Sequence, residues 1–395
     1  MSVSTEKDED SRVPLWNDPR IRGLVSQIVL VVFILWFGYQ LFSNYSTNIA
    51  KQNIATGFGF LSTTAGFSIA QTLIPYTEES SYGQAFLVGL LNTLLVSGVG
   101  IFFATIIGVL LGIARLSKNW IIAKFATVYV ETLRNIPLLL QIYFWYVAVL
   151  GVLPMPRNAS TLFESFFLHK RGLSMPKPVF ETGAIFVLLA LIGAIAMIYF
   201  LSRWARKRQE ATGEQFPVFL SSLGLVIGLP VIAYFLSGSP ISLDHAVLKG
   251  FNFRGGMTLI PEFMALLLAL VLYTATFIAE IVRAGIQAVS HGQTEAANAL
   301  GLRSGQTLRL VVIPQALRVI IPPLTSQYLN LTKNSSLAAA IAYPDVMHTF
   351  AGIVLNQTGQ AVEIILITMA VYLTISLLTS AFMNWYNARI ALVER

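Results

Sequence analysis

The sequence predicts an all-α, polytopic membrane protein with about eight transmembrane helices. Hydrophobic residues make up 55% of the 395 residues and charged residues only 11%, with a mean hydropathy of +0.69. One soluble core cannot bury that much apolar surface. Apolar runs of the length that crosses a bilayer recur along the chain, and Lys and Arg gather between alternate runs.

The apolar runs define the order of the expected helices. They occupy residues 24–43, 85–114, 121–153, 182–201, 218–236, 262–282, 319–341 and 361–383. The first run follows a polar, charged leader (1–23) without a small-residue cleavage site, so we expect a retained signal anchor and a cytoplasmic N-terminus. Pro137 leaves two interpretations of the third run. Either 121–153 crosses once, or 121–136 lies at the interface and 136–153 crosses.

Positive charge supports a topology with both termini in the cytoplasm, because Lys and Arg accumulate on cytoplasmic loops. The residues expected inside outnumber those expected outside. Inside are Lys7, Arg12, Arg20, Arg22, Arg115, Lys118, Lys124, Arg203, Arg206, Lys207, Arg208, Arg283, Arg303, Arg309, Arg318, Arg389 and Arg395. Outside are Lys51, Arg157, Lys170, Arg171, Lys177, Lys249 and Arg254. Orientation in the membrane therefore explains the net charge of +7, and we expect no nucleic-acid partner.

The sequence lacks, or does not bring together, the residues that disulfides, metal sites, ATP binding and catalysis require. The chain has no cysteine, and its four histidines lie far apart, so we expect no disulfide and no metal site. No GxxxxGK[ST] phosphate loop occurs, so ATP would have to bind a separate chain. Ser335 and Ser336 have no histidine near them in sequence. We expect no catalytic residue and no enzyme activity.

A polar stretch over residues 290–315 separates two apolar regions and is expected in the cytoplasm. Ser290 and Gln293 have capping-box spacing, and Gly301 stands where a helix would end. Ser304 is placed to cap a second helix, and Pro314 to bend the chain into the next apolar run. The first helix is either an ordinary loop helix or a docking surface whose small residues let another protein approach.

The residues of this stretch resemble the EAA loop of ABC importer permeases. The resemblance rests on the sequence EAA at Glu295, Ala296 and Ala297, on Gly301, and on the sequence VVIP that ends at Pro314. It implies that these five residues couple the permease to a separate ATP-hydrolysing subunit. Longer stretches, in order, resemble the polar amino acid permease family. They are NTLLVSGVGIFFATIIGVLLGIARLS (92–117), YVETLRNIPLLLQ (129–141), TFIAEIVRAGIQAVSHGQTEAANALG (276–301) and PQALRVIIPPLTSQYLNLTKNSSLAAAI (314–341).

The resemblance implies a type I ABC importer permease core in a bacterial inner membrane. Its expected partners are a second, similar permease subunit, two ATP-binding subunits, a periplasmic amino-acid-binding protein and membrane lipid. ATP and Mg²⁺ would bind the ATP-binding subunits, and this chain would bind no cofactor. An ion-coupled secondary transporter is the alternative, but such proteins typically contain inverted repeats, and no convincing repeat is evident.

The chain departs from the compact family core, which has about five helices. We divide it into the leader (1–23), the signal anchor with a periplasmic segment (24–84), the first core part (85–153), an insertion with two extra spans (154–255) and the second core part (256–395). The enlarged layout resembles the Q-type membrane subunits of general L-amino acid transporters. We expect the two extra helices to pack outside the core and to line no part of the substrate path.

Polar residues inside the apolar run at 319–341 are candidates for that path, because ionisable groups in a membrane are costly and often functional. Lys333 is followed by Asn334, Ser335 and Ser336. The carboxylate of a passing amino acid would meet a cation and hydroxyl donors there. In the other interpretation, Lys333 pairs with a carboxylate of a neighbouring helix or extends to the membrane surface.

The second apolar run carries further polar and small residues. Asn92 and Thr93 either face the path or bond across helices. Gly108 and Gly112 have the spacing of small residues that lets two helices pack closely.

Two acid–base pairs lie near the expected cytoplasmic ends of their helices. Glu131 with Arg134, and Glu280 with Arg283, are each three residues apart and share a helix face. They can pair within a helix or across helices. We expect a role in architecture or gating, with substrate binding as the other interpretation.

Overall fold

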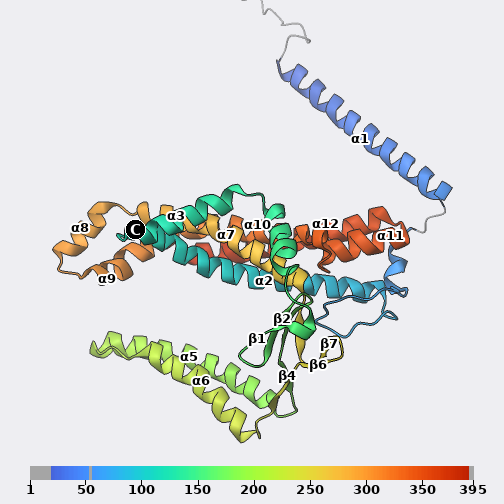
Figure 1. Ribbon diagram of the computed structural model, residues 1–395. Helices are drawn as coiled ribbons and strands as arrows, with labels where there is room; N and C mark the ends of the chain where they lie inside the picture. The colour runs from blue at the N-terminus through green and yellow to red at the C-terminus, as the bar shows by residue number, and fades with distance from the viewer. Residues whose placement is uncertain (1–18, 53–55, 391–395) are drawn as a thin grey trace, which may run out of the picture.

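The computed structural model describes residues 19–52 and 56–390, so residues 1–18 of the predicted leader lie outside the described chain (Figure 1). Seven helical segments of the described chain are long and apolar enough to cross a bilayer. They are α1 (Pro19–Gln52), α2 (Tyr82–Arg115), α5 (Ala184–Thr212), α6 (Val218–Leu236), α7 (Pro261–Gln287), the run from α9 (Ser304–Thr307) through η5 (Leu308–Val312) and α10 (Ile313–Asn334) to η6 (Ser335–Ile341), and α12 (Ala361–Ile390). The predicted helical membrane fold is thus confirmed.

The third predicted run is broken at Pro137. Helix α3 (Trp120–Asn135) ends before it, α4 (Leu138–Tyr143) and the π-helical turn η3 (Phe144–Leu150) follow it, and the two parts are bent by 104°. Proline lacks an N–H and disfavours helical backbone at the preceding residue, here Ile136, which is extended. The Asn119 side chain accepts from Ile121 N (3.0 Å) at the start of α3. If α3 and the segment from α4 to η3 together form one span, the described chain has eight spans, as predicted.

Helix α7 forms the centre of the bundle and packs between α2 and α10. Its buried residues follow the helical repeat and include Leu266, Leu270 and Ile278. A Cβ atom added to Gly108 of α2 would lie 2.6 Å from the Cβ of Ile278, and one added to Gly112 would lie 2.7 Å from the Cβ of Val282. The two backbones therefore approach as closely as glycine permits, which confirms the predicted close helix contact.

Short strands in the insertion and directly after it are the largest departure from the all-α prediction. Four form an antiparallel sheet in the order β1 (Ser160–Leu162), β2 (Phe166–His169), β3 (Gly172–Met175) and β8 (Met257–Leu259). Hairpins pair β4 (Lys177–Phe180) with β5 (Ile241–Asp244), and β6 (Val247–Lys249) with β7 (Asn252–Arg254). The short helix η4 (Pro156–Asn158) precedes them. Strands of three or four residues are too short for a hydropathy pattern to indicate.

The two extra spans, α5 and α6, form a hairpin that extends from these strands beside the bundle (Figure 1). No residue of α6 is buried, and the only buried residues of α5 are Ala194 and Ala205. The helices pack on each other, and Trp204 near the end of α5 meets Phe216 edge-on at 5.4 Å. That they line no part of the substrate path stays a prediction.

A second apolar cluster closes the N-terminal end of α2. It contains Phe60 of η2 (Phe58–Ser62), Tyr82 of α2 and Phe350 of η7 (Met347–Val354). The short helix α11 (Leu355–Thr358) links η7 to α12. Gly57 N donates to Glu363 of α12 (2.8 Å). Helix α1 projects away from this region, and none of its most apolar window is buried by the described chain (Figure 1).

Candidate functional site

The predicted coupling stretch forms helix α8 (His291–Ala299) at one end of the bundle, followed by α9 (Figure 1). Gly301 ends α8 with a left-handed φ of 78°. Gly301 N donates to Asn298 O (2.9 Å) and Leu302 N donates to Ala297 O (3.1 Å). These two bonds form a Schellman motif, which satisfies carbonyls at the helix end and favours glycine at this position. The prediction of a C-terminal cap at Gly301 is confirmed.

The N-terminal caps differ from those predicted. Ser290 is the N-cap residue of α8, but its side chain makes no capping bond, so the predicted capping box is absent. Ser304 is the first residue of α9, and its N-cap is Arg303, whose N–H donates to Gln306 Oε1 (3.0 Å). Serine and threonine are preferred at N-caps on average. Here the side chains of Ser290 and Ser304 cap neither helix.

The EAA residues divide between a buried and an exposed side of α8. Ala297 is buried against the following segment, whereas Glu295 and Ala296 are exposed. Glu295 Oε1 lies 3.0 Å from Nδ1 of His291, one helical turn earlier. Pro314 is the second residue of α10, directly after the π-helical turn η5, and the helical run from Ser304 to Ile341 continues through it. On the exposed side of α8, Gln293 Oε1 accepts from Gln315 Nε2 of α10 (3.3 Å), whereas the ion pair of Glu295 stays within α8.

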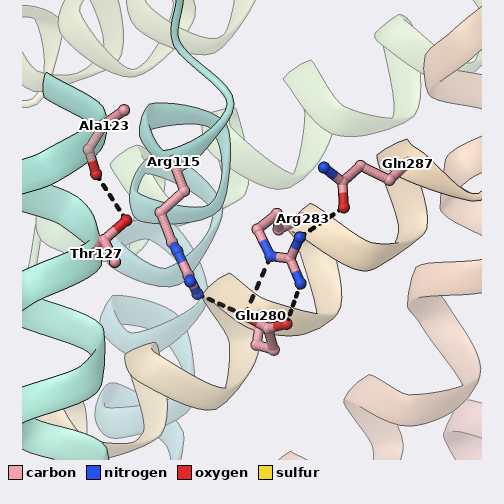
Figure 2. Close-up of polar contacts among 6 residues, drawn as sticks. All are labelled: Arg115, Ala123, Thr127, Glu280, Arg283 and Gln287. Atoms are coloured by element: carbon pink, nitrogen blue, oxygen red, sulfur yellow. Dashed lines mark hydrogen bonds and ion pairs between the residues drawn. The ribbon is translucent and has the colours of Figure 1, made fainter. Parts of the chain in front are cut away.

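Figure 2 shows an ionic cluster where α2 and α7 end near the coupling segment. Glu280 of α7 accepts from Arg283 on the same helix and from Arg115 of α2 (2.5 Å). Arg283 also donates to Gln287 Oε1 (2.5 Å). The predicted pairing of Glu280 with Arg283 is confirmed. Arg115 was not predicted as a partner, because sequence separation gives no sign that the two helix ends meet.

The other predicted pair, Glu131 with Arg134, does not form. No ion pair joins them or links either to another described residue, and both side chains are exposed. Arg134 instead lies over the ring of Phe277 on α7, 5.0 Å from its centroid. Exposed pairs three residues apart gain little free energy, and a cation–π contact of about 0.5–1 kcal/mol competes with them.

Asn92 and Thr93 fasten the loop after η6 to α2. Both are fully buried. Asn92 Nδ2 donates to Pro344 O (2.9 Å), and Val346 N donates to Thr93 Oγ1 (3.1 Å). Tyr343 OH donates to Asn92 O (3.0 Å). Of the two interpretations, these contacts favour bonding across elements over a place on the substrate path.

Asp345 belongs to the same loop and was missed in the sequence. It is fully buried and accepts from His348 N (2.8 Å) and from Tyr372 OH of α12 (3.0 Å). Burial raises the pKa of Asp345 to about 7. The only available signal was an acid between a Tyr-Pro pair and an apolar segment, which also suits a loop.

Lys333 lies in the last turn of α10 and its side chain is exposed. No ion pair connects it to any described residue, so the predicted partner carboxylate is not among them. Asn334 is half-buried. Ser335 Oγ donates to Thr332 O and Ser336 Oγ donates to Lys333 O, both at 2.7 Å. The predicted hydroxyl donors therefore already donate within their own helix, and only their oxygens remain as acceptors.

Among the described residues, no three His, Asp or Glu side chains lie close enough together to hold a metal ion.

This chain is similar to a protein family over its C-terminal part and to individual relatives over almost its whole length. Residues 215–392 match the family model of binding-protein-dependent transport system inner membrane components. The chain is 55% identical over 378 residues to the general L-amino acid transport system permease protein AapQ of Rhizobium johnstonii, covering 96% of this chain and 94% of that protein. It is 54% identical over 378 residues to the putative amino-acid ABC transporter permease protein YhdX of Escherichia coli, covering 96% of each.

Two further matches are more distant. The glutamate/glutamine/aspartate/asparagine transport system permease protein BztB of Rhodobacter capsulatus is 44% identical over 409 residues, covering 96% of each chain. A solved structure, the crystal structure of an amino acid ABC transporter with histidines, aligns with a TM-score of 0.46 at 21% identity, over 78% of this chain and 95% of that chain.

Proposed function

This chain belongs to the family of amino-acid ABC transporter permeases, and from that membership we propose that it is the membrane-spanning subunit of an ATP-driven importer of L-amino acids. One observation carries the proposal. The similarity to the general L-amino acid permease extends over almost the entire length of both chains, insertion included. An ion-coupled secondary transporter gains no support from any of these relatives.

The coupling segment supplies the mechanism that we propose. Helix α8 offers the exposed Glu295 and Ala296 to an ATP-binding subunit, and the Schellman motif at Gly301 fixes the turn between α8 and α9. When ATP draws the two ATP-binding subunits together, α8 moves with its docking site. The cluster of Arg115, Glu280 and Arg283 ties the ends of α2 and α7 together, so the two helices move as a unit.

The complete importer, in this proposal, contains a second permease subunit, two ATP-binding subunits and a periplasmic amino-acid-binding protein. ATP and Mg²⁺ bind the ATP-binding subunits, and the permease performs no chemistry itself. We propose that both termini face the cytoplasm, because basic residues accumulate on cytoplasmic loops. This orientation is supported by the turn joining α5 to α6, which follows the basic stretch 203–208 and lies at the same end of the molecule as α8 (Figure 1).

Reconstitution tests the proposed function. Proteoliposomes that contain the permease pair, the ATP-binding subunits and the binding protein are expected to accumulate radiolabelled L-glutamate only when ATP is present on the side of the membrane that carries the ATP-binding subunits. Unlabelled L-leucine and L-arginine should compete. Uptake that follows an ion gradient and ignores ATP would refute the proposal, and uptake without competition would restrict the importer to acidic substrates.

Lys333 is proposed to bind the α-carboxylate that all L-amino acids share, and its exposed position without a carboxylate partner among the described residues supports this. Lys333→Met is then expected to depress uptake of acidic, neutral and basic substrates alike. The lost charge-assisted bond of about 1.5–3 kcal/mol corresponds to about a ten- to hundredfold loss. Lys333→Arg, which keeps the charge, should restore part of the uptake.

The yield and thermal stability of the complex are measured alongside uptake of each Lys333 variant. If Lys333 instead neutralises a carboxylate of the second permease, Lys333→Met strands that charge, and the loss appears as poor assembly. Removing the partner acid would then rescue the complex.

A further inference from the structure

A pocket of about 540 Å³ lies where the inserted strands meet the N-terminal end of α7. One wall is the turn between β2 and β3, which carries Lys170 and Arg171. The opposite wall belongs to the bundle and includes Tyr146 of η3 and Glu262 in the first turn of α7. The volume falls within the range of about 300–1,000 Å³ that is typical of small-molecule sites.

Charges of opposite sign line this pocket without neutralising one another. Glu262 accepts a hydrogen bond from Tyr146 OH (2.8 Å), which fixes the position of its carboxylate. No ion pair within the described residues joins Glu262 to Lys170 or Arg171, and both cations are exposed. A ligand that carries both charges would satisfy both walls, whereas a simple anion or cation would satisfy only one.

The cationic wall is held in place by its backbone. Lys170 N donates to Pro154 O (2.8 Å), and Arg171 N donates to Nδ1 of the buried His169 (3.1 Å). Burial lowers the pKa of His169, and the nearby charge of Arg171 lowers it further. The ring is therefore neutral and able to accept this bond. A Cβ atom on Gly172 would lie 2.0 Å from Leu259 O, so the turn is pressed directly against β8.

We propose that this pocket is an entry site for free amino acids, with the α-carboxylate against Lys170 and Arg171 and the α-ammonium against Glu262. The assignment rests on the proposed function, because an importer of L-amino acids meets its substrates, which are zwitterions, at its outer face. The charged walls recognise only the two groups that every α-amino acid shares. The site would therefore accept substrates of different side chain and, unlike Lys333, would engage them before they enter the helix bundle.

A single cysteine reports occupancy, because the chain contains no native cysteine. Val147 lines the pocket and is exposed, so Val147→Cys is accessible to a charged methanethiosulfonate reagent. In vesicles that carry the complete transporter, L-glutamine at several times its dissociation constant is expected to slow modification of this chain by about fivefold. Glutaminamide, which lacks the carboxylate, and N-acetylglutamine, which lacks the ammonium, should not protect.

Matched variants locate the effect. Protection should disappear when Val147→Cys is combined with Glu262→Gln, or with Lys170→Met and Arg171→Met together. Phe163→Cys, at an exposed turn of the same insertion, serves as the control and should be modified at one rate with or without glutamine.

Three outcomes would overturn the proposal. They are no protection at any glutamine concentration that supports uptake, equal protection by the analogues, and protection by the binding protein in the absence of an amino acid, which would make the pocket a protein-docking surface. ATP-dependent uptake is measured separately in vesicles with the unmodified chain. Failure of that uptake with intact protection would refute the importer and leave the pocket assignment standing.

Discussion

Replacement of Gly108 by valine is expected to disrupt packing of α2 on α7 and to lower the yield of folded permease sharply. A Cβ atom there would lie 2.6 Å from the Cβ and Cγ2 atoms of Ile278 and 3.0 Å from Ala275 O. The obstructing atoms include helix backbone, so no rotamer change removes the clash. Overpacking typically costs about 1–3 kcal/mol, and we expect a loss at or above the upper end because two helices must separate. Size-exclusion profiles and thermal unfolding in mild detergent measure it.

Gly98→Val is the matched control. Gly98 lies on the same helix, is exposed, and has no atom within 4 Å of the added Cβ. Both variants change helix propensity equally, so any difference between them reports the contact with α7. Equal stability of the two variants would show that the close approach of α2 and α7 does not hold the bundle together.

Gly301→Val is expected to leave ATP hydrolysis largely intact while reducing uptake by an order of magnitude or more. No atom lies within 4 Å of the Cβ that valine would add, so the change is conformational and not steric. A non-glycine residue at the φ of 78° costs about 1–2 kcal/mol, and a β-branched residue more. Relief of this strain is expected to change the turn between α8 and α9, and with it the orientation of α8 at the ATP-binding subunit. Hydrolysis and uptake are measured together in proteoliposomes.

Gly301→Asn separates backbone conformation from side-chain size, because asparagine adopts the left-handed conformation at little cost. We expect it to retain most of the uptake. An equal loss in both variants would mean that bulk at the ATP-binding subunit matters instead, and normal uptake by Gly301→Val would rule out the proposed role of α8.

Hydropathy predicted the spans because a helix in a bilayer must be apolar over its full length. Pro137 raised the interpretation in which the third run is broken, because the effect of its missing N–H is local, but the sequence did not decide between that interpretation and a single crossing. The strands of the insertion were missed because they are held by pairing with distant segments. β3 (Gly172–Met175) pairs with β8 (Met257–Leu259), and no window of sequence contains both.

The same distinction applies to the candidate site. The end of α8 at Gly301 was predictable because a left-handed cap is a local requirement, and the ion pair of Glu280 with Arg283 because one helix carries both. Arg115 joins that pair from α2, and Asp345 is buried by α12, so neither role was visible without the fold.

The pairing of β3 with β8 also determines how the α5–α6 excursion is attached to the rest of the chain. The register sets Met175 opposite Met257, so the two strands that flank the α5–α6 excursion are neighbours in one sheet. Insertion or removal of a stretch of chain whose two ends lie close together is tolerated because the segments on either side need not move. A short turn between β3 and β8 could therefore replace the α5–α6 excursion while the two strands kept their register beside the bundle.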